Sequence, residues 1–213
     1  MTRITLIHAT ALAIEPAHSA FGRLWPQAAL HSLLDEGLPS ALRHEPLTIV
    51  PRFQALVAHA VLAGSRAVLF TCSAFGEAID AVRQAAALPM LKPNEAMFDD
   101  ALRAGQKIAL LATFEPTIEA LSTEFAEACA AAGVAVSLIP MHVPGAMEAL
   151  AAGQPEVHDR LIAQAAAALP PHDAVMLGQF SMARAAQHVA RHTRAPVFTS
   201  PDSAVLRLRR LVG

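Results

Sequence analysis

The segment that decides the fold is Ser65–Gly76, with the sequence SRAVLFTCSAFG. Its apolar run, Ala67–Phe70, predicts a short buried strand, and a helical pattern follows from Glu77 to Ala87. In open α/β sheets, ligands bind at the carboxyl ends of the strands. The amino terminus of a helix also lowers the pKa of a nearby thiol. We therefore expect Cys72, directly after this strand, to be a reactive thiol at a ligand-binding edge.

Composition excludes several classes of protein. The chain has 213 residues, of which 54% are hydrophobic and 16% charged, with a net charge of −2. It has no basic run that indicates nucleic-acid binding, no transmembrane stretch, and an N-terminus, MTRITLIHAT, that reads as a strand rather than a signal peptide. The two cysteines do not form a disulfide framework, so we expect a reduced, cytoplasmic protein that binds neither nucleic acid nor membrane.

Strand-like and helical segments alternate, which favours parallel sheets in an α/β fold. The predicted strands are Ile4–His8, Leu47–Val50, Ala67–Phe70, Met90–Leu91, Ile108–Ala112, Val134–Ile139, Ala174–Leu177 and Val197–Phe198. The predicted helices are Gln27–Asp35, Arg52–Ala63, Glu77–Ala87, Asn94–Ala104, Thr117–Ala132, Ala146–Ala152, Pro155–Leu169, Met182–His192 and Asp202–Leu211.

The sequence also repeats itself over about half its length. AVLFTC, from Ala67, is matched 107 residues later by AVMLGQ, from Ala174, and RITLIHAT is matched 104 residues later by KIALLATF. We therefore expect two pseudo-symmetric α/β lobes, each with a short parallel sheet flanked by helices, and an active-site cleft between them. The expected first lobe is 1–96, with the C-terminal helix 202–213 packing back on it, and the second is 97–201.

These features resemble the aspartate/glutamate (hydantoin) racemase superfamily. The resemblance spans the chain and is carried by the Thr–Cys–Ser strand end in the first lobe and the Ala–Thr-x-x-x-Thr strand end, from Ala112, in the second. Racemases of this family use no cofactor and place one cysteine at the equivalent strand end of each lobe. Cys72 fills the first position, but Gln179, in LGQFSMA, fills the second. A glutamine amide exchanges only hydrogen bonds, so the chain is an atypical member that lacks the second-lobe cysteine.

The resemblance and the positions of residues at strand ends together suggest further roles. Cys72 is the expected base or nucleophile, and His8, at the end of the first strand, is a candidate second proton donor because histidine titrates near neutrality. Hydroxyl and amide groups are expected to hold the substrate; the candidates are Ser73, Ala74, Thr113, Thr117, Gln179 and Ser181. Each hydroxyl could instead cap a helix. Cys129, in a helix among alanines, is expected to fill the core.

We therefore expect a cofactor-independent racemase or isomerase that acts through Cys72 on a small carboxylate carbon acid, either an amino acid or a dicarboxylate. One alternative is a decarboxylase of a substituted malonate-like acid, which needs a single proton donor. Another is a non-catalytic protein that binds small carboxylates. No cofactor or metal is expected, and family resemblance suggests a homodimer.

Overall fold

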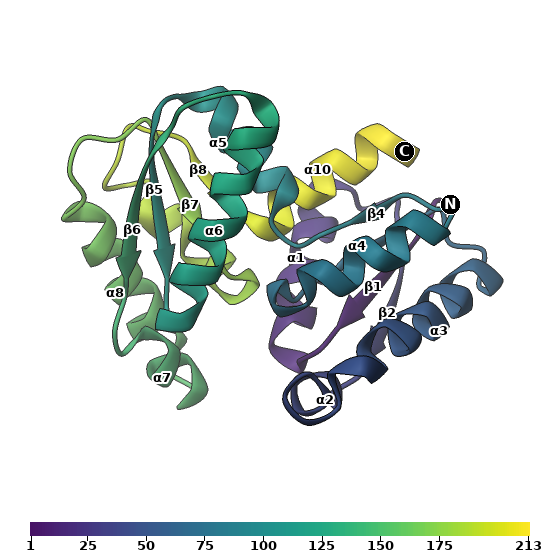
Figure 1. The fold of residues 1–213 in the computed structure, drawn as a ribbon. Helices are drawn as coiled ribbons and strands as arrows, with labels where there is room; N and C mark the ends of the chain where they lie inside the picture. The colour runs from purple at the N-terminus through teal and green to yellow at the C-terminus, as the bar shows by residue number, and fades with distance from the viewer. The chain divides into compact units, whose positions relative to one another are not determined.

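The computed structural model describes all residues from Met1 to Gly213. Contacts divide the chain into two compact units (Figure 1). The first comprises Met1–Pro93 together with Ala204–Gly213, and the second comprises Asn94–Ser203. The chain therefore leaves the first unit, completes the second, and returns to the first for its last ten residues.

The first unit contains a parallel sheet of four strands in the order β2-β1-β3-β4. The central strand β3 is buried along its whole length, as expected for a strand covered on both faces. The strands are β1 (Arg3–His8), β2 (Ala29–Leu34), β3 (Ala67–Phe70) and β4 (Met90–Leu91). The helices are α1 (Ile14–Leu24), α2 (Leu38–His44), α3 (Ile49–Leu62), α4 (Gly76–Ala85) and, from Ala204 onward, α10 (Ser200–Val212), with 3-10 turns at Ala11–Ala13, Pro46–Thr48 and Ser73–Phe75.

The second unit repeats this sheet in the order β6-β5-β7-β8, again all parallel. Its strands are β5 (Lys107–Ala112), β6 (Ser137–His142), β7 (Ala174–Leu177) and β8 (Val197–Thr199). Its helices are α5 (Glu95–Ala104), α6 (Glu115–Ala132), α7 (Ala146–Ala151), α8 (Pro155–Ala167) and α9 (Ala186–Val189), with a 3-10 helix at Phe180–Ala185. Apolar clusters pack on both faces of this sheet, so β7, like β3, is fully buried.

The internal sequence repeat corresponds to a structural repeat. Ile4 of β1 lies opposite Ala67 of β3, and Ile108 of β5 lies opposite Ala174 of β7. The two sheets therefore share strand order and register. The α/β fold with two parallel sheets flanked by helices, predicted from the alternating segments, is confirmed.

Two of the predicted elements are wrong. The segment Gln27–Asp35, predicted as a helix, contains β2 instead, and Leu47–Val50, predicted as a strand, is a 3-10 turn that leads into α3. β2 is a partly exposed edge strand, so its apolar residues do not show the burial pattern of a central strand. Pro51, which directly follows the second segment, lies in the first turn of α3, where proline is tolerated.

Other predicted boundaries also shift. β6 begins at Ser137 rather than Val134 and continues to His142. The segment predicted as the helix Met182–His192 is divided between the 3-10 helix and the single turn of α9. Helices α1 and α2 were not predicted. None of the helices combines the length and the apolar character needed to cross a membrane.

Candidate active-site edges

Cys72 follows β3 with an extended backbone and precedes the 3-10 turn Ser73–Phe75, after which α4 begins. Its half-buried side chain packs against the core cluster that contains Ile7 and Phe70. It also lies among the apolar residues Ile7, Ala9, Leu38, Phe53, Phe70 and Phe75, which leave no room beside the thiol for a water molecule. The thiol therefore lies at the predicted strand end but in apolar surroundings.

These surroundings correct one expectation about Cys72. Burial raises the pKa of the Cys72 thiol, and the hydrogen bond from the backbone N–H of Ala74 opposes this shift without overcoming it. The expectation that the helix terminus lowers the pKa of Cys72 is therefore wrong for the free protein. The resting side chain is a neutral thiol. Next to it, Ser73 is half-buried and Ala74 is exposed.

His8 lies on the other face of the same sheet. Side chains alternate along a strand, and Ile7 and Ala9 belong to the apolar cluster against which Cys72 packs, so His8 points away from that cluster. The ring is fully buried, at 0% exposed. Its Nδ1 lies 2.9 Å from Thr71 Oγ1 and its Nε2 lies 3.2 Å from Ser32 Oγ.

Burial, with a smaller contribution from the charge of His18, lowers the pKa of His8 to about 4. The expectation that His8 titrates near neutrality is therefore wrong. The imidazole is neutral at pH 7, and its two nitrogens are within hydrogen-bond distance of Thr71 and Ser32 rather than of Cys72.

At the edge of the second sheet, Gln179 follows β7 as Cys72 follows β3. Its Oε1 accepts two hydrogen bonds from Thr113, one from the backbone N–H at 2.6 Å and one from Oγ1 at 2.8 Å. These two donors fix the orientation of the amide, because an amide NH₂ could not accept either hydrogen bond. The two N–H donors of Gln179 are therefore directed away from Thr113.

The remaining candidates in the second unit have different roles. Thr113 is buried and spends both its donors on Gln179, so it positions the amide rather than presenting a free hydroxyl. Thr117 is half-buried in the first turn of α6, where its backbone N–H bonds to the carbonyl of Phe114. Ser181 is half-buried in the 3-10 helix that follows Gln179.

The two edges are built at equivalent positions with different chemistry. Cys72 and Gln179 are separated by the same 107 residues that relate β3 to β7, and Ala9 and Thr113 by the same 104 that relate β1 to β5. Ala9 belongs to the apolar cluster against which Cys72 packs, whereas Thr113 hydrogen-bonds Gln179. A thiol therefore has an apolar neighbour in one unit, and an amide has a polar one in the other.

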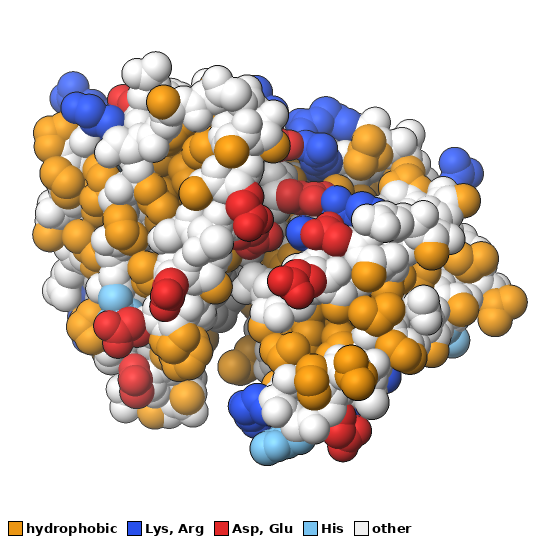
Figure 2. Space-filling view, in the orientation of Figure 1, with side chains coloured by type: hydrophobic (Ala, Val, Ile, Leu, Met, Phe, Trp, Pro, Cys, Tyr) orange, Lys and Arg blue, Asp and Glu red, His pale blue; other side chains and the backbone are white.

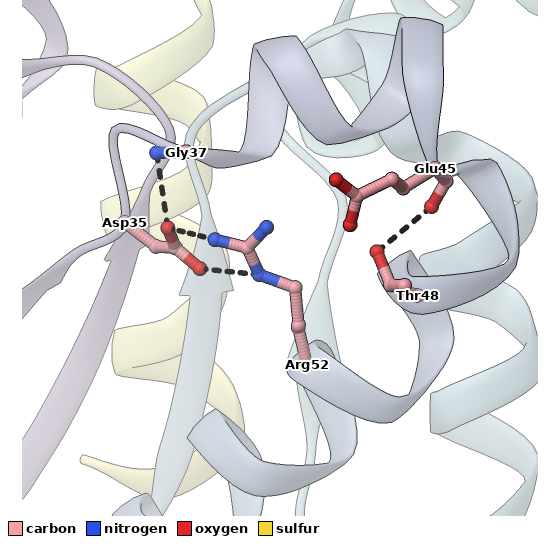
Figure 3. A network of polar contacts seen from close by, with 5 residues as sticks. All are labelled: Asp35, Gly37, Glu45, Thr48 and Arg52. Atoms are coloured by element: carbon pink, nitrogen blue, oxygen red, sulfur yellow. Dashed lines mark hydrogen bonds and ion pairs between the residues drawn. The ribbon is translucent and has the colours of Figure 1, made fainter.

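Sequence reasoning missed two charged groups near the first edge. Asp35, directly after β2, accepts hydrogen bonds from the Arg52 guanidinium of α3, one of them from Nε at 2.9 Å, and from the Gly37 backbone N–H (Figure 3). Lys92, directly after β4, pairs with Asp80 of α4. The incorrect helix over Gln27–Asp35 concealed Asp35, whereas the position of Lys92 after a predicted strand could have revealed it.

An apolar pocket of about 520 Å³ lies elsewhere in the first unit, between α3 and the end of α4. Ser65 and Leu88, which line it, precede β3 and β4, so it lies toward the amino ends of the strands. Apolar side chains are visible on the surface of this region in Figure 2. The pocket is therefore separate from the edge that carries Cys72. The chain holds no group of three or more His, Cys, Asp or Glu side chains arranged to bind a metal ion.

The duplicated parallel sheets carry a thiol and a fixed amide at equivalent strand ends, which is the edge where open α/β sheets bind ligands. The model of the Asp/Glu/Hydantoin racemase family matches residues 40–208, and the chain belongs to this family. No curated protein is significantly similar to it in sequence.

Solved structures share the fold at low sequence identity. Glutamate racemase RacE1 from Bacillus anthracis is 13% identical, with a TM-score of 0.75 over 99% of this chain and 81% of its own. An aspartate racemase homologue from Pyrococcus horikoshii is 16% identical, with a TM-score of 0.74 over 99% of both chains. Allantoin racemase from Pseudomonas fluorescens is 17% identical, with a TM-score of 0.72 over 99% of this chain and 90% of its own.

Proposed function

We propose that the chain is a cofactor-independent isomerase of the racemase type that acts on a small carboxylate carbon acid. Cys72 exchanges the proton on the carbon next to the carboxylate, and the amide of Gln179 donates hydrogen bonds to the substrate. Family membership supports the reaction class. The observation that carries the assignment of roles is the pair of hydrogen bonds from Thr113, which leaves the NH₂ of Gln179 free to donate.

The state of Cys72 sets how the reaction begins. Because burial raises its pKa, the thiol holds its proton in the free protein and can deliver it to a carbanion. To act as the base, it must transfer this proton to solvent water when substrate binds. A substrate that brings hydrogen-bond donors to the sulfur would favour the thiolate. The exposed backbone at Ala74 already supplies one such donor.

The amide at position 179 limits the stereochemistry. Gln179 can stabilise negative charge on the substrate by hydrogen bonding, but it cannot give or take a proton. A single acid–base group then exchanges the proton on one face of the carbon. We therefore propose proton exchange with retention as the basal reaction, with inversion slower than exchange.

Incubation of candidate acids in D₂O, followed by ¹H NMR and chiral chromatography, tests this proposal. The panel consists of both enantiomers of glutamate and aspartate, with allantoin and simple 5-substituted hydantoins as carbon acids that lack a carboxylate; exchange of the latter alone would contradict the proposed substrate class. We expect loss of the α-proton signal for at least one acid, with exchange faster than inversion. Absence of exchange above the uncatalysed rate for every acid would contradict the proposed reaction.

Matched variants separate the roles of the residues. Cys72→Ser should reduce exchange at least a hundredfold, whereas Cys129→Ser, which changes the other half-buried cysteine, should leave it unaltered.

Gln179→Glu can still accept hydrogen bonds from Thr113 but replaces the NH₂ donors with a negative charge, so we expect KM to rise at least tenfold. Gln179→Cys restores a second thiol, and we expect it to raise inversion relative to exchange. Unchanged inversion in the folded variant would count against this last role.

A further inference from the structure

Ser32, His8 and Thr71 form a row of hydrogen bonds on the face of the first sheet that is opposite Cys72. Ser32 Oγ lies 3.2 Å from His8 Nε2, and His8 Nδ1 lies 2.9 Å from Thr71 Oγ1. The three residues come from β2, from β1 and from the end of β3. The hydroxyl of the exposed residue Ser32 is thus within hydrogen-bond distance of the buried His8 imidazole, and Thr71 holds the other nitrogen of that ring. This arrangement is diagnostic of an activated nucleophile.

The direction of the hydrogen bonds follows from the far end of the row. Thr71 Oγ1 donates to the backbone carbonyl of Ile7 at 3.3 Å, so it accepts from His8 Nδ1–H. The imidazole then carries its proton on Nδ1, and the lone pair of Nε2 faces Ser32. The Ser32 hydroxyl therefore donates to His8, which is the orientation required for removal of its proton.

A second imidazole approaches the same hydroxyl from the exposed side. His18 Nε2, from α1, lies 2.8 Å from Ser32 Oγ. Because Ser32 gives its only proton to His8, His18 donates an N–H to the oxygen. The two rings therefore hold the Ser32 side chain in one orientation, with one lone pair of Oγ left for an incoming electrophile.

The backbone of β2 supplies a donor next to this oxygen. β2 is an edge strand paired only with β1, and the N–H groups of Ala29 and Asp35 bond to carbonyls on the β1 side. In a parallel pair alternate residues face the neighbouring strand, so the N–H of Ser32 points toward the open edge. A nucleophile's own N–H in this position can stabilise an oxyanion that forms on the group it attacks.

We propose that Ser32 is a second reactive centre, a nucleophilic hydroxyl that accepts acyl groups from small activated esters. In the proposed step Ser32 Oγ bonds to the carbonyl carbon while its proton passes to His8 Nε2. The bond from that carbon to the leaving oxygen then breaks, and the leaving oxyanion takes the proton from Nε2. Thr71 and His18 position the imidazole and the hydroxyl. The centre uses neither Cys72 nor Gln179 and is independent of the isomerase activity proposed above.

The reactivity expected of this centre is modest. His8 is a weak base, because burial lowers its pKa to about 4, and weak bases remove protons less effectively. Thr71, which holds the His8 ring, is a neutral hydroxyl rather than a carboxylate. It therefore orients the ring without stabilising an imidazolium charge. We therefore expect Ser32 to react about tenfold faster than an ordinary exposed serine.

Labelling of the full chain with an alkyl fluorophosphonate tests the proposal. The reagent forms an Oγ–phosphorus bond, fluoride leaves, and the hydroxyl proton passes to His8. Mass spectrometry of peptides gives the labelling rate at Ser32 and, in the same sample, at the exposed serines Ser19 and Ser40. We expect Ser32 to be labelled about tenfold faster than either. Equal rates at the three serines in the unmodified chain would overturn the proposal.

Two variants locate the cause of the reactivity. Ser32→Ala should remove the fast label without changing the rates at Ser19 and Ser40. His8→Gln can still hydrogen-bond but cannot act as the base, so it should lower the Ser32 rate to that of the two reference serines. Circular dichroism checks that this buried variant folds. If it does not fold, the ratio of rates in the unmodified chain still decides the question. A folded His8→Gln chain that keeps the fast label would also contradict the assignment.

Discussion

At the residue scale, the environment of each side chain decides its chemistry more than its identity does. Cys72 and His8 are residue types that often act near neutral pH, yet burial moves both pKa values away from neutrality, upward for Cys72 and downward for His8. Both shifts disfavour the charged form, as desolvation requires. Gln179 is a residue type without acid–base chemistry, but Thr113 gives it a fixed orientation suited to binding an anion.

The low pKa of His8 predicts a specific loss of stability in acid. Its folded pKa is about 4, whereas the unfolded value is close to the reference of 6.5. The unfolded chain therefore binds this proton more readily, so the contribution to folding is complete above pH 6.5 and is lost as the pH falls toward 4. We expect a decrease of about 2 kcal/mol in the free energy of unfolding over this window.

Urea unfolding between pH 7 and pH 4.5 measures this decrease. The folded His8→Gln variant is the control, because it lacks the titrating ring and should show a shallower dependence on pH. The contribution from His8 would be refuted if both proteins lost stability equally.

At the element scale, short loops join strands to helices, and small residues are needed where chain segments approach closely. Gly105, between α5 and β5, is an example: a Cβ at this position would collide with the Asp173 side chain. Asp173 in turn accepts hydrogen bonds at 2.8 Å from the backbone N–H groups of Gln106 and Lys107. These hydrogen bonds lower the pKa of the Asp173 carboxyl.

Gly105→Ala should therefore destabilise the protein by about 2 kcal/mol, because either the loop or Asp173 must move. Gly22→Ala is the matched control. Gly22 lies within α1, and a Cβ there would meet no atom within 4 Å, so we expect stabilisation of about 0.5–1 kcal/mol from helix propensity. Chemical denaturation of both variants compares them, and equal effects of the two substitutions would contradict the steric argument.

Buried strands could be predicted from the sequence, whereas the exposed edge strand β2 could not. Strands buried on both faces, such as Ala67–Phe70 and Ala174–Leu177, were predicted with their correct bounds. A short apolar run bounded by turn residues fits a buried strand and is too short for a typical helix. β2 was missed because an edge strand mixes exposed and buried residues in a pattern that also fits a helix. The position of Gln179 equivalent to Cys72 follows from the repeat alone.

The details of the candidate site could not be predicted in this way. The Thr113–Gln179 contact joins residues far apart in the chain, and desolvation depends on how side chains such as Phe53 and Leu38 surround the thiol. The face on which His8 lies was available from strand alternation once its register with β3 was known. The contact with Ser32 was not, because β2 itself was misassigned.

At the scale of the whole molecule, the second unit is inserted in the sequence before the last ten residues of the first unit. Helix α10 begins in the second unit and continues into the first, and Val205 and Leu208 on it are fully buried. Arg209 donates a hydrogen bond of 3.0 Å to the carbonyl of Leu24 at the end of α1. The last ten residues are therefore part of the first unit's structure rather than a tail.

Leu208→Ala should lower the free energy of unfolding by about 2–5 kcal/mol, the range found when a buried leucine is truncated to alanine. Leu206→Ala, on the same helix at a position that is 38% exposed, is the control and should cost less than half as much. Thermal and urea unfolding measure both. A small effect of Leu208→Ala would show that α10 does not support the first unit.

This return of the chain has a consequence for synthesis on the ribosome. The residues of the second unit are contiguous, whereas the first unit also needs Ala204–Gly213, which are synthesised after the whole of the second unit. Until those residues have left the ribosome, the apolar surface that α10 covers in the first unit is open to aggregation or to chaperones. The unit that is begun first on the ribosome is therefore the last to be completed.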